Sequence, residues 1–248
     1  MQRILGVRID NLNRREILEK TAFFLSEKKF HQIATVGPEF VLLAQKDEKF
    51  RDILNRCDLN VADGVGIWFA FIRYFSFLKT RFTGVDLMMK ILKMAEKRGL
   101  GVFLAARKDG LSSWKETRDA ILKIYPKLNI AGENYDISVI ASEAWQSRAD
   151  NFGIASSQTP RKDILFCNFG APHQEYFINS VKNDTIRLAM GVGGSFDFLT
   201  GKIKRAPKIL RRFGFEWLWR LFQQPNRWKR IFRAAVVFPI KVILCREK

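Results

Sequence analysis

Residues 59–66 read Leu-Asn-Val-Ala-Asp-Gly-Val-Gly, an apolar run that ends in a carboxylate flanked by glycine. The apolar run predicts a buried strand, and the glycines predict a tight loop before a helical pattern that begins near residue 64. In an open parallel sheet, ligands bind at the carboxyl ends of the strands. Asp63 therefore stands where an α/β enzyme places a functional side chain.

Three other stretches repeat this arrangement of an apolar run followed by a polar or glycine-containing loop. They are residues 33–39, 164–175 and 188–197. Because the carboxyl ends of parallel strands meet at one edge of a sheet, we expect all four loops to form a single site.

Strand-like and helix-like patterns alternate along the first 200 residues. The pattern predicts strands near residues 4–9, 31–36, 58–62, 102–105, 128–131, 163–168 and 186–192. It predicts helices near residues 13–28, 39–46, 48–56, 64–76, 83–98, 110–125, 138–150 and 173–182. Such alternation favours an α/β fold in which a mostly parallel sheet carries helices on both faces.

The net charge of +18 is concentrated at the C-terminal end of the chain. Residues 201–248 contain fourteen Lys or Arg and two Glu, so this last fifth holds two-thirds of the excess charge. Its basic residues are interleaved with Trp and Phe at helical spacing. This pattern is typical of amphipathic helices at membrane surfaces. We therefore divide the chain into a body, residues 1–200, and a basic, aromatic helical appendage, residues 201–248.

A polyanionic partner fits this charge: an acidic membrane surface, a diphosphate ligand or a nucleic acid. An ordinary basic helix pair packed on the body is the simpler interpretation.

The apolar stretch at residues 234–244 is too short to span a bilayer and is broken by Pro239. Three widely spaced cysteines fit neither a zinc site nor a disulfide framework, and no signal peptide is evident, so we expect a cytoplasmic chain with reduced thiols.

Chemistry can be assigned to a few of these loop residues. Asp63 is the best candidate for a general base, although an Asp before Gly also caps helices. The stretch Gly191-Val192-Gly193-Gly194 could offer backbone N–H groups to a phosphate, or form only a tight turn. It is not G-x-G-x-x-G, because residue 196 is Phe, so a dinucleotide enzyme is disfavoured.

The chain offers little for a metal ion to bind. It has only two histidines and no Asp-x-Asp pair, which argues against a carboxylate-held divalent cation. If a diphosphate leaves here, cationic side chains such as Arg81 and those of the appendage have to stabilise its charge.

The loop motifs follow one another in a recognisable order. The order is Thr35-x-Gly37-Pro38-Glu39, Ala62-Asp63-Gly64-x-Gly66, Arg81-x-x-Gly84-x-Asp86-Leu87, Phe169-Gly170-x-Pro172-x-Gln174-Glu175, Gly191-Val192-Gly193-Gly194-x-Phe196-Asp197-x-x-x-Gly201, Arg205-Ala206-Pro207, Glu216-Trp217, Arg220-Leu221 and Pro225-x-Arg227. From about residue 4 to residue 233, this order resembles the TagA/WecG/CpsF glycosyltransferases (glycosyltransferase family 26).

The resemblance implies a Rossmann-like α/β domain with an appendage that docks at the membrane and completes the site. It implies inverting transfer of a sugar from a UDP-sugar donor to a polyprenyl-diphosphate-linked acceptor, in the synthesis of teichoic acids or cell-surface polysaccharides. The donated sugar would be N-acetylmannosamine, its uronic acid or a hexose. The enzyme would work at the cytoplasmic face of the membrane as a peripheral protein, without a cofactor, a metal ion or a nucleic-acid partner.

The resemblance also assigns roles to individual residues. It makes Asp63 the catalytic base and adds Thr35, Arg81 and Gln174 as catalytic positions. It also maps the arginines of the appendage onto Arg212, Arg220 and Arg227. We expect these three, together with Gly37, Gly64, Gly191, Gly193, Gly194, Asp197 and Arg205, to be the substrate-binding positions. The chain departs from the family pattern at two places. The family usually has Asn where this chain has Gly37. In the stretch Gly132-Glu133-Asn134-Tyr135, the family more often has a second glycine.

A basic nucleic-acid-binding protein with an α/β body is the alternative function. Arg and Trp interleaved in the appendage are compatible with stacking on bases. The strand-end loops of the body are mixed or acidic in charge, which disfavours this reading.

Overall fold

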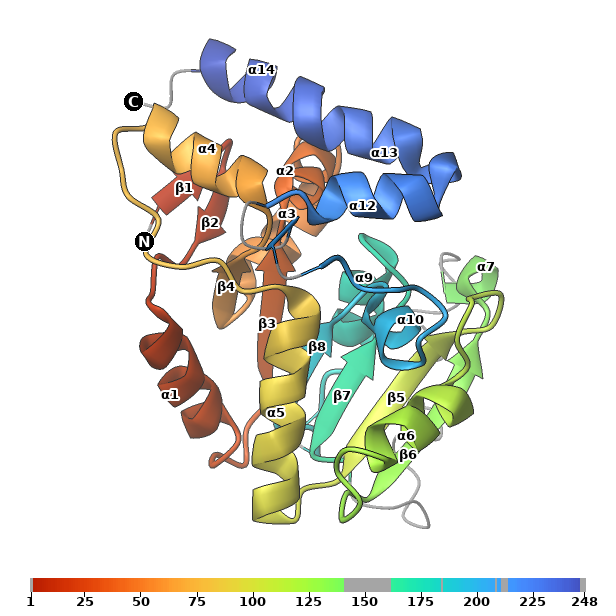
Figure 1. The fold of residues 1–248 in the computed structure, drawn as a ribbon. Coiled ribbons are helices and arrows are strands. Elements are labelled where there is room, and N and C mark those ends of the chain that lie inside the picture. Colours follow the sequence, from red (N-terminus) through yellow and green to blue (C-terminus); the bar gives the residue numbers. More distant parts are fainter. Residues whose placement is uncertain (1, 141–161, 184, 208, 211–213, 246–248) are drawn as a thin grey trace.

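The computed structural model describes residues 2–140, 162–183, 185–207, 209–210 and 214–245 (Figure 1). Six parallel strands form one sheet in the order β4-β3-β8-β7-β5-β6. The predicted α/β class and Rossmann-like parallel sheet are confirmed. The strands are β3 (His31–Val36), β4 (Leu59–Ala62), β5 (Val102–Arg107), β6 (Ile130–Tyr135), β7 (Ile164–Cys167) and β8 (Leu188–Gly191).

Helices cover both faces of the sheet (Figure 1). Successive residues of a strand point to opposite faces, so Ile33 packs in one apolar cluster and Ala34 in another. Burial on both sides explains why these strands read as continuous apolar runs. One face carries α1 (Arg14–Phe24), α5 (Gly84–Arg98) and α6 (Trp114–Leu122); the other carries α2 (Pro38–Ala44), α3 (Glu48–Arg56) and α9 (His173–Ser180). Two short helices, α7 (Ile137–Ile140) and α10 (Ser195–Leu199), complete the body.

Capping residues set where the helices begin and end. Ser113 caps α6 and forms a capping box with Glu116, so this helix begins at Trp114 rather than near residue 110. Thr83 caps α5, and Gly99 ends it in the left-handed region at φ +62°. Most of the helix predicted at residues 138–150 lies outside the described residues.

The single strand predicted near residues 4–9 is wrong. This segment forms an antiparallel hairpin, β1 (Gln2–Ile4) and β2 (Val7–Ile9), which lies outside the main sheet. Leu5 and Gly6 both have positive φ, +47° and +77°, as the turn of a tight hairpin requires. The apolar pattern runs straight through this turn, which hides it from a periodicity argument.

The appendage lies with α4 (Val65–Arg73) across the carboxyl edge of the sheet (Figure 1). A short 3₁₀ turn that begins at Pro225 separates two helical segments of the appendage. The break expected at Pro239 is wrong: this proline occupies the first turn of a helix that continues from a π-helical turn. The segments are α12 (Glu216–Gln223), η2 (Pro225–Arg227), α13 (Trp228–Phe232), η3 (Arg233–Val237) and α14 (Phe238–Leu244). Within the described ranges, none of the helices has the length and apolar character needed to cross a membrane.

Candidate active site

A cleft of about 1130 Å³ lies between the carboxyl ends of the strands and the appendage. The loops after β3, β4, β7 and β8 all line it, as the sequence predicted for a single site. Thirteen of the predicted site residues line this cleft: Thr35, Gly37, Asp63, Gly64, Arg81, Gln174, Gly191, Gly193, Gly194, Asp197, Arg205, Arg220 and Arg227. Arg212 lies outside the described residues.

Asp63 is placed by the end of β4. Its backbone N–H donates to the Val36 carbonyl at 2.9 Å, which continues the register between β3 and β4 by one residue. Gly64 follows at φ +83°, a conformation that suits glycine and turns the chain away from the sheet. Gly64 is also the N-cap of α4, so Asp63 does not occupy the capping position of that helix.

The environment of the Asp63 carboxyl group raises its pKa to about 7. Burial is the main cause, and the negative charge of Glu216 adds to it. Hydrogen bonds from the backbone N–H groups of Gly84 and Gly64, and the charge of Arg81, act in the opposite direction. A carboxyl group with a pKa near neutrality is well matched to take a proton from a substrate and release it again.

Glu216, at the start of α12, brings a second carboxylate close to Asp63, and sequence reasoning did not select it as a site residue. It faces Arg205, whose Nε lies 3.6 Å from the Glu216 Oε1. Arg205 in turn donates to Asp86 Oδ1 at 2.8 Å and to Thr83 Oγ1 at 3.2 Å. The only sequence signals were the Glu216-Trp217 and Arg205-Ala206-Pro207 motifs, which do not reveal that these side chains meet.

This ion-pair network connects the appendage to the candidate base. Thr83 is the N-cap of α5, and Gly84, the first residue of that helix, donates its N–H to the Asp63 carboxyl group. A Cβ at Gly84 would lie 3.3 Å from the Thr35 hydroxyl oxygen, so glycine allows α5 to approach β3 closely. Thr35 itself is 8% exposed at the base of the cleft.

Arg220, Arg227 and Arg230 form an arginine cluster on the appendage side of the cleft. Burial, together with the charge of Arg230, lowers the pKa of Arg220. Burial and the charges of Arg220 and Arg230 lower the pKa of Arg227 to about 10. Arg230 is held by an ion pair with Glu39 in the first turn of α2. Guanidinium groups gathered in this way attract anions such as a diphosphate.

Arg220 is poised directly over the glycine loop. A Cβ at Gly194 would lie only 2.1 Å from its Nη2 atom, so only glycine leaves room for this guanidinium. Its Nε and Nη2 atoms are buried, and within the described part of the chain they have no hydrogen-bond partner. Buried guanidinium donors of this kind are satisfied when an anion binds.

Gln174 holds two of the loops rather than pointing freely into the cleft. Its Oε1 accepts from the N–H groups of Gly170 and Gly193, each at 3.1 Å, and its Nε2 donates to Glu175 at 2.7 Å. It is 2% exposed, and a Cβ at Gly191 would lie 2.3 Å from its Nε2. This geometry favours a positioning role for Gln174.

Asp197 also has a partner within the protein. It is 8% exposed, and its Oδ1 accepts a hydrogen bond from the Ser112 hydroxyl at 2.9 Å. Its charge raises the pKa of Arg220 and Arg227 against the lowering effect of burial. Asp197 therefore balances part of the charge of the arginine cluster.

The cleft thus combines the Asp63 carboxyl group on the body with a glycine loop and the arginine cluster of the appendage. Among the described residues, no group of three or more His, Cys, Asp and Glu lies close enough together to hold a metal ion. Cys57, Cys167 and Cys245 are free. A carboxyl group opposite cationic side chains is an arrangement that suits group transfer from a phosphate-linked donor.

Comparison with known proteins identifies the class of enzyme. The sequence matches the family model described as "Glycosyl transferase WecG/TagA/CpsF family" over residues 2–248. The chain therefore belongs to this family, and it is a glycosyltransferase.

Individual relatives carry a more specific name. The chain is 32% identical over 222 residues to the N-acetylglucosaminyldiphosphoundecaprenol N-acetyl-beta-D-mannosaminyltransferase of Bacillus subtilis (strain 168), covering 87% of this chain and 80% of that protein. It is 29% identical over 250 residues to the enzyme of the same name from Staphylococcus aureus (strain MRSA252), covering 99% of this chain and 93% of that protein.

Proposed function

We propose that this glycosyltransferase moves an N-acetylmannosaminyl group from a UDP-sugar to N-acetylglucosaminyl diphosphoundecaprenol, with inversion at the anomeric carbon. The names of the relatives supply the sugar and the acceptor. The observation that carries the mechanism is the position of Asp63, a carboxyl group with a pKa near 7 facing a cleft lined by the arginine cluster.

In this mechanism Asp63 acts as the general base. The acceptor hydroxyl attacks the anomeric carbon of the donor from the side opposite the diphosphate. The new carbon–oxygen bond forms as the bond between the anomeric carbon and the diphosphate oxygen breaks, and the hydroxyl proton passes to the Asp63 carboxylate. A single displacement of this kind inverts the configuration of the sugar.

The departing UDP carries away the electron pair of the broken bond, so its diphosphate needs stabilisation. Arg220 and Arg227 supply positive charge, and Gly194 leaves room for the Arg220 guanidinium over the glycine loop. We infer that these groups stabilise the leaving group without a metal ion. Arg81, whose charge acts on Asp63, completes the positive lining on the body side.

A transfer assay tests the donor, the stereochemistry and the metal requirement together. We expect N-acetylmannosamine to be transferred to the lipid-linked N-acetylglucosamine acceptor with roughly a hundred-fold preference in kcat/KM over UDP-N-acetylglucosamine and UDP-glucose. Mass spectrometry gives the product, and NMR of the new linkage gives its configuration. Activity is expected to survive a metal chelator. A preferred hexose or uronic acid donor, a retained configuration, or loss of activity with the chelator contradicts the corresponding part of the proposal.

The pH dependence of kcat/KM tests the link between Glu216 and the base. Because Asp63 must be ionised to accept a proton, we expect kcat/KM to rise with pH through about 7 and then level off. The charge of Glu216 is a cause of the raised pKa, so Glu216→Gln should move this rise to lower pH. Glu216→Asp keeps the charge and serves as the control. Coincident pH profiles for Glu216→Gln and the wild type would remove Glu216 from the mechanism.

We further infer that the appendage docks on an acidic membrane surface at the cytoplasmic face, where a lipid-linked acceptor is presented. Phe222, Trp228 and Phe232 are exposed on α12 and α13, beside the basic residues Lys229 and Arg233. Apolar side chains insert at the acyl boundary, and each basic residue near an acidic surface contributes about 1 kcal/mol. No specific feature of the cleft favours a nucleic-acid ligand over this arrangement.

A further inference from the structure

Exposed apolar side chains gather on one side of the molecule. Within the described residues, seventeen large apolar side chains are exposed, and thirteen of them belong to residues 68–77 and 215–244. Scattered exposed apolar residues are ordinary, but a contiguous group marks an interaction surface. The thirteen are Trp68, Ile72, Phe75, Phe77, Phe215, Trp217, Phe222, Trp228, Phe232, Val236, Ile240, Ile243 and Leu244.

Four of the thirteen belong to the body, on α4 and the loop after it. Helix α4 lies beside α14 (Figure 1), and Arg73 Nη2 at its end donates to the Ile243 carbonyl at 3.2 Å. Helix α4 buries Ile67, Ala70 and Phe71 against the body and leaves Trp68 and Ile72 outside.

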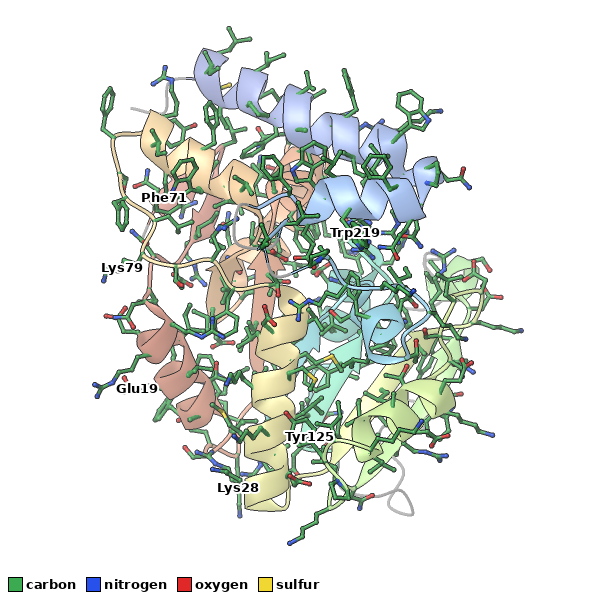
Figure 2. All side chains as sticks on the ribbon, in the orientation of Figure 1. Glu19, Lys28, Phe71, Lys79, Tyr125 and Trp219 are labelled. Atoms are coloured by element: carbon green, nitrogen blue, oxygen red, sulfur yellow. The ribbon has the colours of Figure 1, made fainter. Side chains whose placement is uncertain are left out.

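The neighbouring helix α14 shows the same division. It buries Phe238 and Val242 and leaves Ile240 and Ile243 outside. Carbon-rich side chains project outward from both helices in Figure 2. The two helices are in contact, and each therefore exposes apolar side chains beside the other, one helix belonging to the body and one to the appendage.

The loop at residues 74–78 extends this surface with two phenylalanines. Phe75 is 97% exposed and Phe77 is 75% exposed. The loop backbone is nevertheless fixed: Ser76 N–H donates to the Phe71 carbonyl at 2.9 Å, and Asn11 Nδ2 donates to the Phe77 carbonyl at 2.7 Å. Phe75 also has φ +53°, an unfavourable conformation for a residue with a side chain. A hydrogen-bonded loop thus presents two aromatic rings to water.

The two chain segments that form this surface are strongly basic. Residues 64–82 and 214–245 contain nine Lys or Arg and a single acidic residue, Glu216, which faces Arg205 inside the cleft. Arg73, Lys79, Lys229, Arg233 and Lys241 belong to these two segments. An apolar surface with basic residues around it matches a bilayer with anionic headgroups and an apolar interior.

The surface also has a suitable position relative to the cleft. Ile231, Ala234 and Pro239 line the cleft, whereas Phe232, Val236 and Ile240 of the same helical stretch are exposed. This helical stretch therefore has one side in the cleft and exposed apolar side chains on another. A diphosphate attached to a membrane lipid can reach the cleft past this helix while its hydrocarbon chain stays in the bilayer.

We propose that α4 and the loop at residues 74–78 form a second membrane-binding element on the body, with Phe75 and Phe77 inserting into an anionic bilayer beside the appendage. The proposal rests on the membrane docking proposed above for the appendage, and extends it to a part of the chain whose apolar sequence reads as an ordinary core helix.

Vesicle binding tests this element without disturbing the appendage or the cleft. The double variant F75S/F77S is compared with the wild type and with F23S/I124S, which removes two side chains of 57% and 52% exposure from α1 and from the segment after α6. Vesicles contain phosphatidylglycerol and phosphatidylethanolamine in equal parts, or phosphatidylcholine alone. We expect F75S/F77S to bind the anionic vesicles about ten-fold more weakly or worse, because two inserted rings are lost. The control variant should match the wild type.

Three further measurements distinguish the possible outcomes: activity with a soluble acceptor, activity with an acceptor in vesicles, and sedimentation without lipid. With a short-chain soluble acceptor, F75S/F77S should keep wild-type activity, and with the acceptor in vesicles its activity should fall. Equal vesicle binding by F75S/F77S and the wild type overturns the second element while leaving docking by the appendage in place. If the wild type binds no vesicles, both proposals fail. Sedimentation without lipid completes the test, because self-association that is lost in F75S/F77S would assign the surface to a second copy of the chain.

Discussion

Replacing Asp63 by Asn is expected to lower the turnover number about a thousand-fold, within the range that a general base contributes. The amide fills nearly the same space but cannot take the acceptor proton. Donor binding should persist, because the arginine cluster and the glycine loop are unchanged. The measurement is single-turnover transfer from a labelled UDP-sugar, with the rise in melting temperature on UDP binding as the control. Turnover within a few-fold of the wild type would show that another group takes the proton.

The same variant should not lose stability, and the sign follows from the pKa. Asp63 has a pKa of about 7 in the folded protein against a reference value of 3.8. The folded state therefore holds this proton more tightly than the unfolded chain. The resulting stabilisation is complete below pH 3.8 and is lost as the pH rises through 7. Asn stays neutral at every pH, so at pH 8 the variant should unfold at the same temperature as the wild type or higher.

Replacing Arg220 by Ala is expected to lower the turnover number about a hundred-fold or more, the usual effect of removing a group that stabilises charge in the transition state. Its guanidinium lies over Gly194, and within the described residues two of its nitrogen atoms are buried without a hydrogen-bond partner. Arg220→Lys should recover only part of the rate, because an ammonium group lacks the planar fork that matches a diphosphate.

Arg233→Ala is the matched control for this prediction. Arg233 is exposed in the same appendage and does not line the cleft, so with a soluble acceptor its loss should leave turnover unchanged. Arg220→Ala should also fold normally, since it removes a cation that is repelled by Arg230. Equal rates for Arg220→Ala and Arg233→Ala would contradict the proposed anion site.

The sequence predicted the α/β class and the loops that meet at the cleft because both depend on local patterns. Apolar runs followed by glycine mark the strand ends, and thirteen predicted residues line one cleft. The order of the strands could not be predicted, because periodicity does not say which strands are neighbours. The hairpin at the N-terminus was missed because the apolar run of residues 4–9 continues through its turn.

The parts of the site that the sequence did not predict depend on contacts between residues far apart in the chain. Arg205 and Asp86 are 119 positions apart, and no spacing rule connects them. Glu216 was hidden for the same reason, since its effect on Asp63 exists only after the appendage has folded over the sheet. The exposed face of α4 was missed because a helix with a mostly apolar sequence is usually buried on all sides.

Phe238 has a consequence for any attempt to study the appendage by cutting it off. This ring is fully buried, within 3.4 Å of where a Cβ on Gly66 would lie, in the same apolar cluster as residues of α2 and α4. A fragment ending at residue 200 would expose the apolar residues that surround Phe238 to water, and we expect this fragment to aggregate. Poor solubility of such a fragment would result from the loss of the Phe238 side chain from the core and would say nothing about affinity for lipid. Point substitutions on the outer surface are therefore the informative experiment.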